Sequence, residues 1–219
     1  MNKLQYSTEK YYFSPLVESW FQLPVNAGSL YKLHHLKKYG VFSRKKDQSS
    51  DWHKIFYKKI REDATFFNVY EKFLRDIIKP RYNNEEIVYQ RIPTFRVHLA
   101  GNLAVGEYHK DKQYRKKEWA EAVKEINYFL PFTDTNQSNT IWAESEEDKG
   151  DFSPMILKYG ECMEWDGSNL THGNKLNDSD QTRVSVDFRV IRRSLYVDSE
   201  CASINTNTPF RIGGYYEVI

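Results

Sequence analysis

The sequence predicts a mainly β protein with flanking helices. Two observations carry this prediction. Apolar residues in the first third recur at helical spacing, and from about residue 86 onward short runs rich in Val, Ile, Tyr, Phe and Thr alternate with Asn, Gly, Asp and Pro. A chain of 219 residues suffices for one domain with a substantial core. We therefore expect a single domain, with a mainly helical part over 1–85, a β core over 86–196 and a tail over 197–219.

The helical prediction rests on the segment from Ser49 to Ile78, whose apolar residues recur at steps of three and four. Ser50 and Asp51 offer capping side chains before Trp52, and Pro80 stops the pattern. One or two amphipathic helices are expected here. A shorter helix is expected over about Lys116 to Ala122.

The β prediction rests on eight short apolar segments separated by turn residues. They are Glu86 to Gln90, Thr94 to Leu99, Val105 to His109, Glu125 to Pro131, Thr140 to Glu144, Met155 to Lys158, Cys162 to Trp165 and Arg183 to Ile191. Such a pattern indicates a sandwich or a barrel, and a jelly roll accommodates this number of strands. Asn136 to Asn139 and Glu144 to Asp151 are expected as exposed loops, and Ser199 to Thr208 as a loosely structured tail.

The composition argues against several classes of protein. The 32 basic and 30 acidic residues are interspersed and leave a net charge of +2, which provides no broad basic surface for nucleic acid. No apolar run approaches the roughly 20 residues of a membrane helix. The first residues lack the pattern of a secretory signal, so we expect a cytoplasmic protein with Cys162 and Cys201 reduced.

His109-Lys110-Asp111 and the later His172 are the candidate catalytic and metal-binding residues. Two imidazoles and one carboxylate form the ligand set that holds non-heme Fe(II) on one face and leaves three positions open. Each residue alone is more often structural, so the combination carries the prediction. Such a site would keep a net charge near +1, which favours a dianionic, chelating 2-oxo acid.

A polar stripe follows His172 in the predicted strand Arg183 to Ile191. Arg183, Ser185, Asp187 and Arg189 share one face, whereas Val184, Val186, Phe188 and Val190 share the other. If the polar face is exposed, its charges are surface pairs. If it lines the interior, Arg183 can grip the distal carboxylate of the 2-oxo acid and Arg189 can approach the carboxylate near the metal.

The order and spacing of these residues resemble those of the 2-oxoglutarate- and Fe(II)-dependent oxygenases, whose fold is a double-stranded β-helix, a cupin-like relative of the jelly roll. The branch typified by a streptomycin-biosynthesis oxygenase is the most similar. The segments that carry this resemblance are 96–99, 106–111, 125–131, 142–145, 159–161, 166–167, 172–174 and 183–189. The match spans about Tyr89 to Arg192, and Gly213-Gly214-Tyr215-Tyr216 are a further candidate part of it.

The resemblance implies an enzyme that uses Fe(II), 2-oxoglutarate and O2 to hydroxylate a small polar metabolite, such as a sugar, an aminocyclitol or an amino-acid derivative. Asp111 argues against the related halogenases, which lack the acidic ligand. Asn127 is implied as a hydrogen-bond partner of the cosubstrate, with a structural cross-strand amide as the alternative. The implied substrate contacts are Arg96, Asn102, Glu107, Trp142, Glu144 and Asn174. Trp142 also suits a core position, and Glu107 also suits the orientation of a ligand imidazole.

Two other functions stay open. The spacing of Arg183 and Arg189 also resembles that of the branch that demethylates alkylated nucleic acid. Such an enzyme needs a basic groove and aromatic side chains that stack on a flipped base. The 13 Phe and 16 Tyr supply aromatics, but the balanced charge supplies no groove. The other alternative is a cupin-like module that binds metal or sugar and turns over no 2-oxoglutarate.

Overall fold

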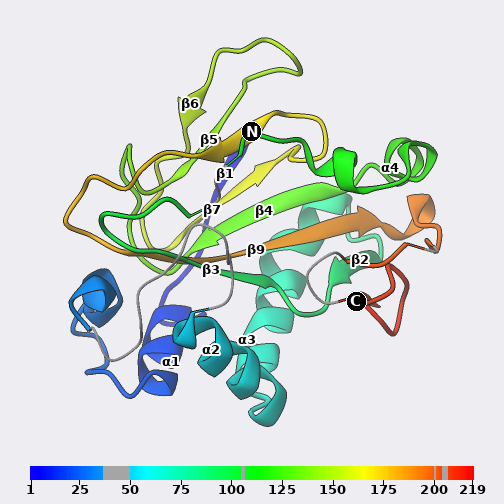
Figure 1. Cartoon of the computed structure of the whole chain (residues 1–219). Coiled ribbons are helices and arrows are strands. Elements are labelled where there is room, and N and C mark those ends of the chain that lie inside the picture. Colours follow the sequence, from blue (N-terminus) through cyan, green and yellow to red (C-terminus); the bar gives the residue numbers. More distant parts are fainter. Residues whose placement is uncertain (37–49, 105–106, 200, 204–206) are drawn as a thin grey trace.

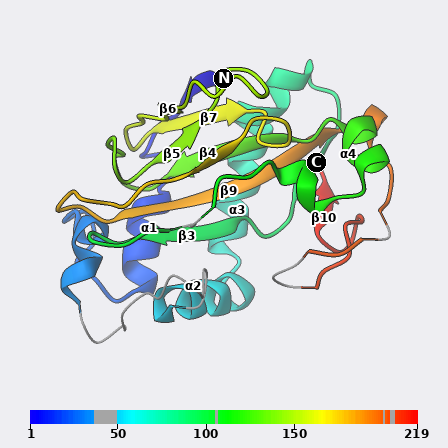
Figure 2. The same cartoon turned by 45° about the horizontal axis from the view of Figure 1, so that its top comes forward.

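The computed structural model describes residues 1–36, 50–104, 107–199, 201–203 and 207–219 (Figure 1). Within this part of the chain a layer of helices covers one face of a large antiparallel sheet, and a small sheet lies over its other face (Figure 2). The helices are α1 (Phe13–Trp20), α2 (Asp51–Glu62), α3 (Thr65–Phe73) and α4 (Lys117–Val123), with short stretches of 3-10 or π helix at Ser29–His35, Leu74–Ile78, Lys79–Tyr82, Asp111–Tyr114 and Arg193–Leu195.

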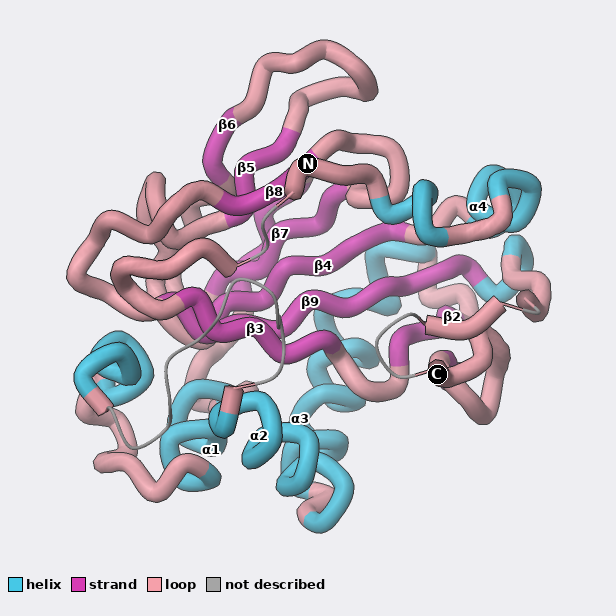
Figure 3. Tube along the Cα trace, in the orientation of Figure 1, coloured by secondary structure: helices cyan, strands magenta, loops and turns pink. Residues whose placement is uncertain are grey.

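The strands are β1 (Asn2–Gln5), β2 (Ile87–Gln90), β3 (Thr94–His98), β4 (Ile126–Pro131), β5 (Ile141–Ala143), β6 (Ser153–Pro154), β7 (Glu161–Trp165), β8 (His172–Asn174), β9 (Arg183–Arg192) and β10 (Tyr216–Val218). The large sheet has the order β1-β7-β4-β9-β2-β10, and β3 also pairs with β9. The small sheet has the order β6-β5-β8. Figure 3 shows both sheets in magenta against the cyan helices.

β9 is the central strand because it pairs along its whole length. On one side its first half pairs with β3, from Asp187 opposite Thr94 to Arg183 opposite His98, and its last residues pair with β2. On the other side it pairs with β4. This arrangement places the polar stripe of β9 between neighbours on both sides.

The apolar face of the large sheet forms the main core with α1, α2 and α3. Val184, Val186, Phe188 and Val190 of β9 are fully buried there. Aromatic rings fill the space between helix and sheet: Phe56 of α2 stacks on Phe95 of β3 at 4.1 Å between ring centroids. A second, smaller core lies between the two sheets and consists of Phe129, Ile141, Ala143, Met155, Leu157, Met163 and Trp165. The other face of the large sheet is therefore also covered.

The predicted helices over 49–78 and 116–122 are confirmed, as are the strands that correspond to β2, β3, β4, β5, β7 and β9. The strand predicted at Met155 to Lys158 is wrong: the ladder with β5 takes Ser153 and Pro154 instead, and Leu157 bonds to the side chain of Thr135. For the strand predicted at Val105 to His109, residues 105 and 106 lie outside the described residues, and His109 makes only an isolated bridge with His172.

Both ends of the chain join the large sheet, which the sequence did not predict. Asn2–Gln5 pairs with β7, and Tyr216–Val218 pairs with β2. The expected exposed loops are also partly buried, since Asn139 is fully buried and Glu144 is 3% exposed. None of the described helices has the length and apolar character needed to cross a bilayer.

Candidate metal centre

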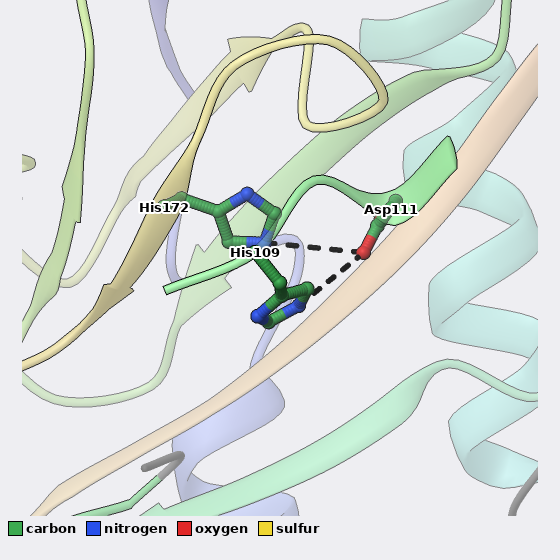
Figure 4. A group of neighbouring side chains, drawn as sticks. All are labelled: His109, Asp111 and His172. Carbon is green, nitrogen blue, oxygen red and sulfur yellow. Dashed lines mark ion pairs between the residues drawn. The ribbon is translucent and has the colours of Figure 1, made fainter. Parts of the chain in front are cut away.

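The side chains of His109, Asp111 and His172 lie close together, and both imidazoles face the Asp111 carboxylate (Figure 4). Asp111 Oδ1 is 3.7 Å from His109 Nε2 and 3.9 Å from His172 Nε2. The candidate ligand atoms of all three residues lie within 4.8 Å of one another. Two imidazole nitrogens and one carboxylate oxygen at these separations suit a single divalent transition metal on one face.

Backbone hydrogen bonds bring the three residues together. His109 and His172 exchange two of them, each 2.9 Å long between nitrogen and oxygen. Asp111 follows at the start of a 3-10 turn, and its backbone N–H donates to the carbonyl of Gly167 at 3.0 Å. Gly173 lies so close to the Tyr108 ring that an added Cβ would be 2.9 Å from it. The pairing of two distant segments therefore sets the separation of the two imidazoles.

Both imidazoles turn the same nitrogen toward the candidate metal position. His109 Nδ1 lies 3.0 Å from the carbonyl oxygen of Glu107, and His172 Nδ1 lies 2.9 Å from that of Leu170. A carbonyl only accepts, so each Nδ1 carries the hydrogen and each Nε2 keeps its lone pair. The lone pairs are the ones that face Asp111.

Asp111 uses its two carboxylate oxygens differently. Oδ2 accepts hydrogen bonds from Asn127 Nδ2 at 2.8 Å and from Arg189 Nη2 at 2.7 Å, while Oδ1 faces the imidazoles. Burial alone would raise the pKa of Asp111, but the charge of Arg189 and the hydrogen bond from Asn127 hold this pKa well below its usual range. The residue is thus an ionised carboxylate with one oxygen available to a metal.

The two imidazoles have different proton affinities. Burial would lower the pKa of His109, but its contacts with Asp111 and the Glu107 carbonyl raise it above its ordinary value. Burial dominates at His172 and lowers its pKa. A metal needs both rings neutral, so protons compete with it mainly at His109.

The candidate ligands open into a pocket between the two sheets. It is lined by Arg96, His109, Asp111, Asn127, Ile141, Trp165, His172, Gly173, Asn174, Arg183, Asp187 and Arg189. Three buried polar atoms in or beside it have no hydrogen-bond partner among the described residues: Asn127 Oδ1, Trp165 Nε1 and Ser185 Oγ. Buried polar atoms in native proteins are nearly always satisfied, so these atoms indicate a polar ligand.

The polar face of β9 lines this pocket. Arg183 is 1% exposed, and its guanidinium carbon lies 5.4 Å from the centre of the Phe129 ring. Arg189 lies farther along the strand beside Asp111. Asp187, between them, accepts a hydrogen bond from Arg96 Nε at 3.1 Å. The sequence left open whether this face is exposed or lines the interior, and in the structure it lines the interior.

Two of the six predicted substrate contacts line the pocket and four do not. Arg96 and Asn174 belong to the pocket lining. Asn102, Glu107, Trp142 and Glu144 are not among the lining residues. Glu144 accepts backbone hydrogen bonds from Gly150 and Thr171, and Trp142 donates to the carbonyl of Gln137. Glu144 and Trp142 thus hydrogen-bond to backbone groups, and a substrate contact for the four residues outside the lining stays a prediction.

Lysines on either side of Asp111 hold the loop between β5 and β6. Lys110 Nζ is 3.0 Å from Glu147 and 2.6 Å from Asp148, and Lys112 also pairs with Glu147. The Lys-rich turn and the acidic stretch, which the sequence shows as separate charged segments, are therefore partners. Their pairing ties the loop to the residues that flank the candidate ligand.

Comparison with known proteins identifies a relative. No family model matches the chain. The streptomycin biosynthesis protein StrG of Streptomyces griseus is 36% identical over 181 residues, which are 82% of this chain and 81% of StrG. The chain belongs to the StrG family.

Several solved structures resemble this StrG-family chain loosely. CytC3 with Fe(II) and alpha-ketoglutarate is 12% identical with a TM-score of 0.48, over 91% of this chain and 77% of CytC3. AviO1 from Streptomyces viridochromogenes Tue57 is 13% identical with a TM-score of 0.48, over 84% and 87% of the two chains. A nickel complex of the non-heme monooxygenase ThoJ is 12% identical with a TM-score of 0.45, over 86% and 71%.

Several residues around the StrG-family site had no role in it assigned from the sequence, although Asp187 was placed in the polar stripe and Tyr215 in the Gly-Gly-Tyr-Tyr segment. Gln90, Glu125 and Tyr215 surround Arg189, and Trp165 and Asp187 line the pocket. For Glu125 the sequence offered one indication, because this charged residue directly precedes a mainly apolar strand. Tyr215 had another in the Gly-Gly-Tyr-Tyr segment. Gln90 had none, since a glutamine at a strand end is ordinary.

Proposed function

We propose that this StrG-family protein is an Fe(II)- and 2-oxoglutarate-dependent dioxygenase that hydroxylates a small polar metabolite. The observation that carries the proposal is that one pocket between two antiparallel sheets contains both the His109, Asp111 and His172 cluster and the buried Arg183. The paired antiparallel sheets with a site between them suit a double-stranded β-helix, which is the fold we assign. When bound, Fe(II) with 2-oxoglutarate and O2 supplies the oxidant that removes a hydrogen atom from the substrate.

The residues present fit this chemistry. His109, Asp111 and His172 would hold Fe(II) through two nitrogens and one oxygen. Arg183 would bind the distal carboxylate of 2-oxoglutarate, because a buried guanidinium pairs strongly with a carboxylate where water is excluded. The unpartnered Ser185 hydroxyl shares the face of β9 with Arg183 and offers a further donor.

The substrate side of the pocket is polar and charged. Arg96 and Asp187 form an ion pair whose side chains are 20% and 15% exposed, and Asn174 lies on the opposite sheet. Exposed aromatic rings of Tyr108 and Tyr114 flank the candidate ligands. Polar groups that converge on a pocket with aromatic rings at its edge suit a hydroxylated or amino-bearing ring more than an apolar chain.

Anaerobic titration of the metal-free protein with Fe(II) and 2-oxoglutarate tests the proposal. A chelated 2-oxo acid gives a weak visible charge-transfer band, which we expect in the wild type and not in His172→Ala. Arg183→Met should keep Fe(II) binding and raise the concentration of 2-oxoglutarate needed for the band. His35→Ala, an imidazole outside the pocket, is the matched control and should behave as wild type.

The outcomes distinguish the hydroxylase from the metal-binding module that the sequence left open. A band followed by succinate release that depends on an added sugar, aminocyclitol or amino acid supports the hydroxylase. Folded protein that binds Fe(II) but gives no band and no succinate with any substrate would refute it and favour the metal-binding module.

A further inference from the structure

Arg189 is surrounded by protein groups on every side of its guanidinium. Nε and Nη2 donate to Asp111 Oδ2 at 3.2 and 2.7 Å, and Nη1 donates to the Tyr215 hydroxyl at 2.9 Å and to Gln90 Oε1 at 3.3 Å. Glu125 Oε1 lies 2.8 Å from Nε. A guanidinium has five N–H donors in a rigid plane, so partners on three of its nitrogens fix its orientation.

The partners of Arg189 are themselves held in place. Gln90 donates through Nε2 to the Ile92 carbonyl and to the Thr94 hydroxyl, which turns its oxygen toward Arg189. Glu125 is 4% exposed and accepts a hydrogen bond from the Tyr216 hydroxyl at 2.9 Å. Arg189 therefore lies in a rigid frame and not in a flexible surface pair.

The C-terminal segment Pro209–Tyr216 supplies two hydroxyls of this frame. Tyr216 is fully buried and Phe210 is 1% exposed, in a core shared with Val88, Trp119, Val123 and Ile191. The backbone N–H of Tyr215 donates to the Pro209 carbonyl at 3.0 Å, which closes the segment on itself. In Figure 1 this segment, in red, lies beside β2 and the end of β9. Apolar burial thus positions the Tyr215 and Tyr216 hydroxyls.

The charged side chains at and around Arg189 are two carboxylates and two guanidiniums, so their charges cancel. Asp111 and Glu125 are the carboxylates, and Arg189 and Arg115 are the guanidiniums, with Arg115 3.7 Å from Glu125 and stacked over the Phe210 ring at 3.9 Å. A buried charge is tolerated only when it is paired and hydrogen-bonded. The C-terminal segment takes part in this balance, because Phe210 supports Arg115 and Tyr216 bonds to Glu125.

We propose that the C-terminal segment is part of the metal centre: Tyr215 and Glu125 are positioning residues that hold Arg189 on Asp111 Oδ2, so that only Oδ1 faces the metal. This inference rests on the metal site of the proposed function but not on its cosubstrate. With Oδ2 taken by Arg189 and Asn127, the carboxylate binds through one oxygen. The positions that two oxygens would cover stay open for other ligands.

Co(II) titration of the metal-free protein tests the inference without turnover. The visible bands of bound Co(II) report its affinity and, through their intensity, its coordination number. Tyr215→Phe removes one hydroxyl and Glu125→Gln removes one charge at nearly constant shape. We expect the Kd for Co(II) to rise roughly 10-fold or more in each, with altered band intensities, since residues that orient metal ligands typically contribute 10- to 100-fold.

The control is Tyr196→Phe. Its hydroxyl bonds to Asp198 at the surface, and its ring contacts Tyr216 without reaching Arg189. It should bind Co(II) as the wild type does. Wild-type affinity and band shape in Tyr215→Phe would overturn the inference and leave the proposed function intact. A wild type that gives no bands, or bands that persist in His172→Ala, would overturn both.

Discussion

The protein should lose less unfolding free energy on acidification when His98 is replaced by Gln. His98 is fully buried on β3, opposite Arg183 in the sheet. Burial, reinforced by the charge of Arg183, lowers its pKa to about 3, although the carbonyls of Asn102 and Asn139 beside its ring favour the charged form. The imidazole therefore stays neutral in the folded protein, whereas in the unfolded chain it titrates near its ordinary value of about 6.5.

The sign and size of the effect follow from these two values. Below pH 6.5 the unfolded chain takes up a proton that folded His98 refuses, so stability falls as the pH falls toward 3 and is unaffected above about 7. Each pKa unit corresponds to about 1.4 kcal/mol. A pH of 5 is about 1.5 units below the pKa of His98 in the unfolded chain. This one residue should therefore account for a loss of about 2 kcal/mol in unfolding free energy between pH 7 and pH 5.

Denaturant unfolding at pH 7.5 and pH 5 measures this loss, with a chelator present to remove metal. Between the two pH values the wild type should lose about 2 kcal/mol more unfolding free energy than His98→Gln. Comparing the losses of the two proteins cancels the contribution of the other titrating groups and the cost of the substitution itself. Equal losses in the two proteins would refute the reasoning, because His98 would then titrate alike in the folded and unfolded states.

Three further predictions concern stability. Asp111→Ala removes one hydrogen-bond acceptor of Arg189 and leaves Glu125 as its remaining carboxylate. The metal-free variant should therefore lose about 1–3 kcal/mol of unfolding free energy in denaturant, and no loss would contradict the buried pair. Gly173→Ala places a Cβ 2.9 Å from the Tyr108 ring and should lower the unfolding free energy by about 1–3 kcal/mol. Adding Tyr108→Ala should recover part of this loss, which thermal unfolding of the single and double variants measures. Phe95→Ala removes the stacking partner of Phe56 and should cost about 3–5 kcal/mol, and a loss under 1 kcal/mol would contradict the packing.

The pair His109 and Asp111 and the polar stripe of β9 could be predicted because they depend on local order. His109 and Asp111 are two positions apart, and strand alternation alone puts Arg183 and Arg189 on one face. The sequence does not show which acid each arginine meets. Arg189 meets Asp111 through the pairing of β9 with β4, which places Arg189 opposite Asn127, and both side chains donate to Asp111 Oδ2.

The strands that the sequence missed are short and gain their structure from distant partners. Asn2–Gln5, His172–Asn174 and Tyr216–Val218 have at most four residues each, too few for an alternating pattern. Each is held by a neighbour far along the chain, such as β7 for Asn2–Gln5. Met155 to Lys158 shows the converse, since its composition suits a strand. The N–H of Met155 donates to β5, at Ile141, whereas those of Leu157 and Lys158 donate to the side chains of Thr135 and Glu161.

Both faces of β9 are buried in contacts that the fold or the pocket needs. Arg183, Asp187 and Arg189 line the pocket, and the even-numbered positions between them belong to the main core. A single-residue insertion or deletion within the strand would turn three or four charged or hydroxyl side chains toward the aromatic core and valines toward the pocket. Among homologues, length changes in this region are therefore expected before Arg183 or after Arg192, where the strand ends, and not between them.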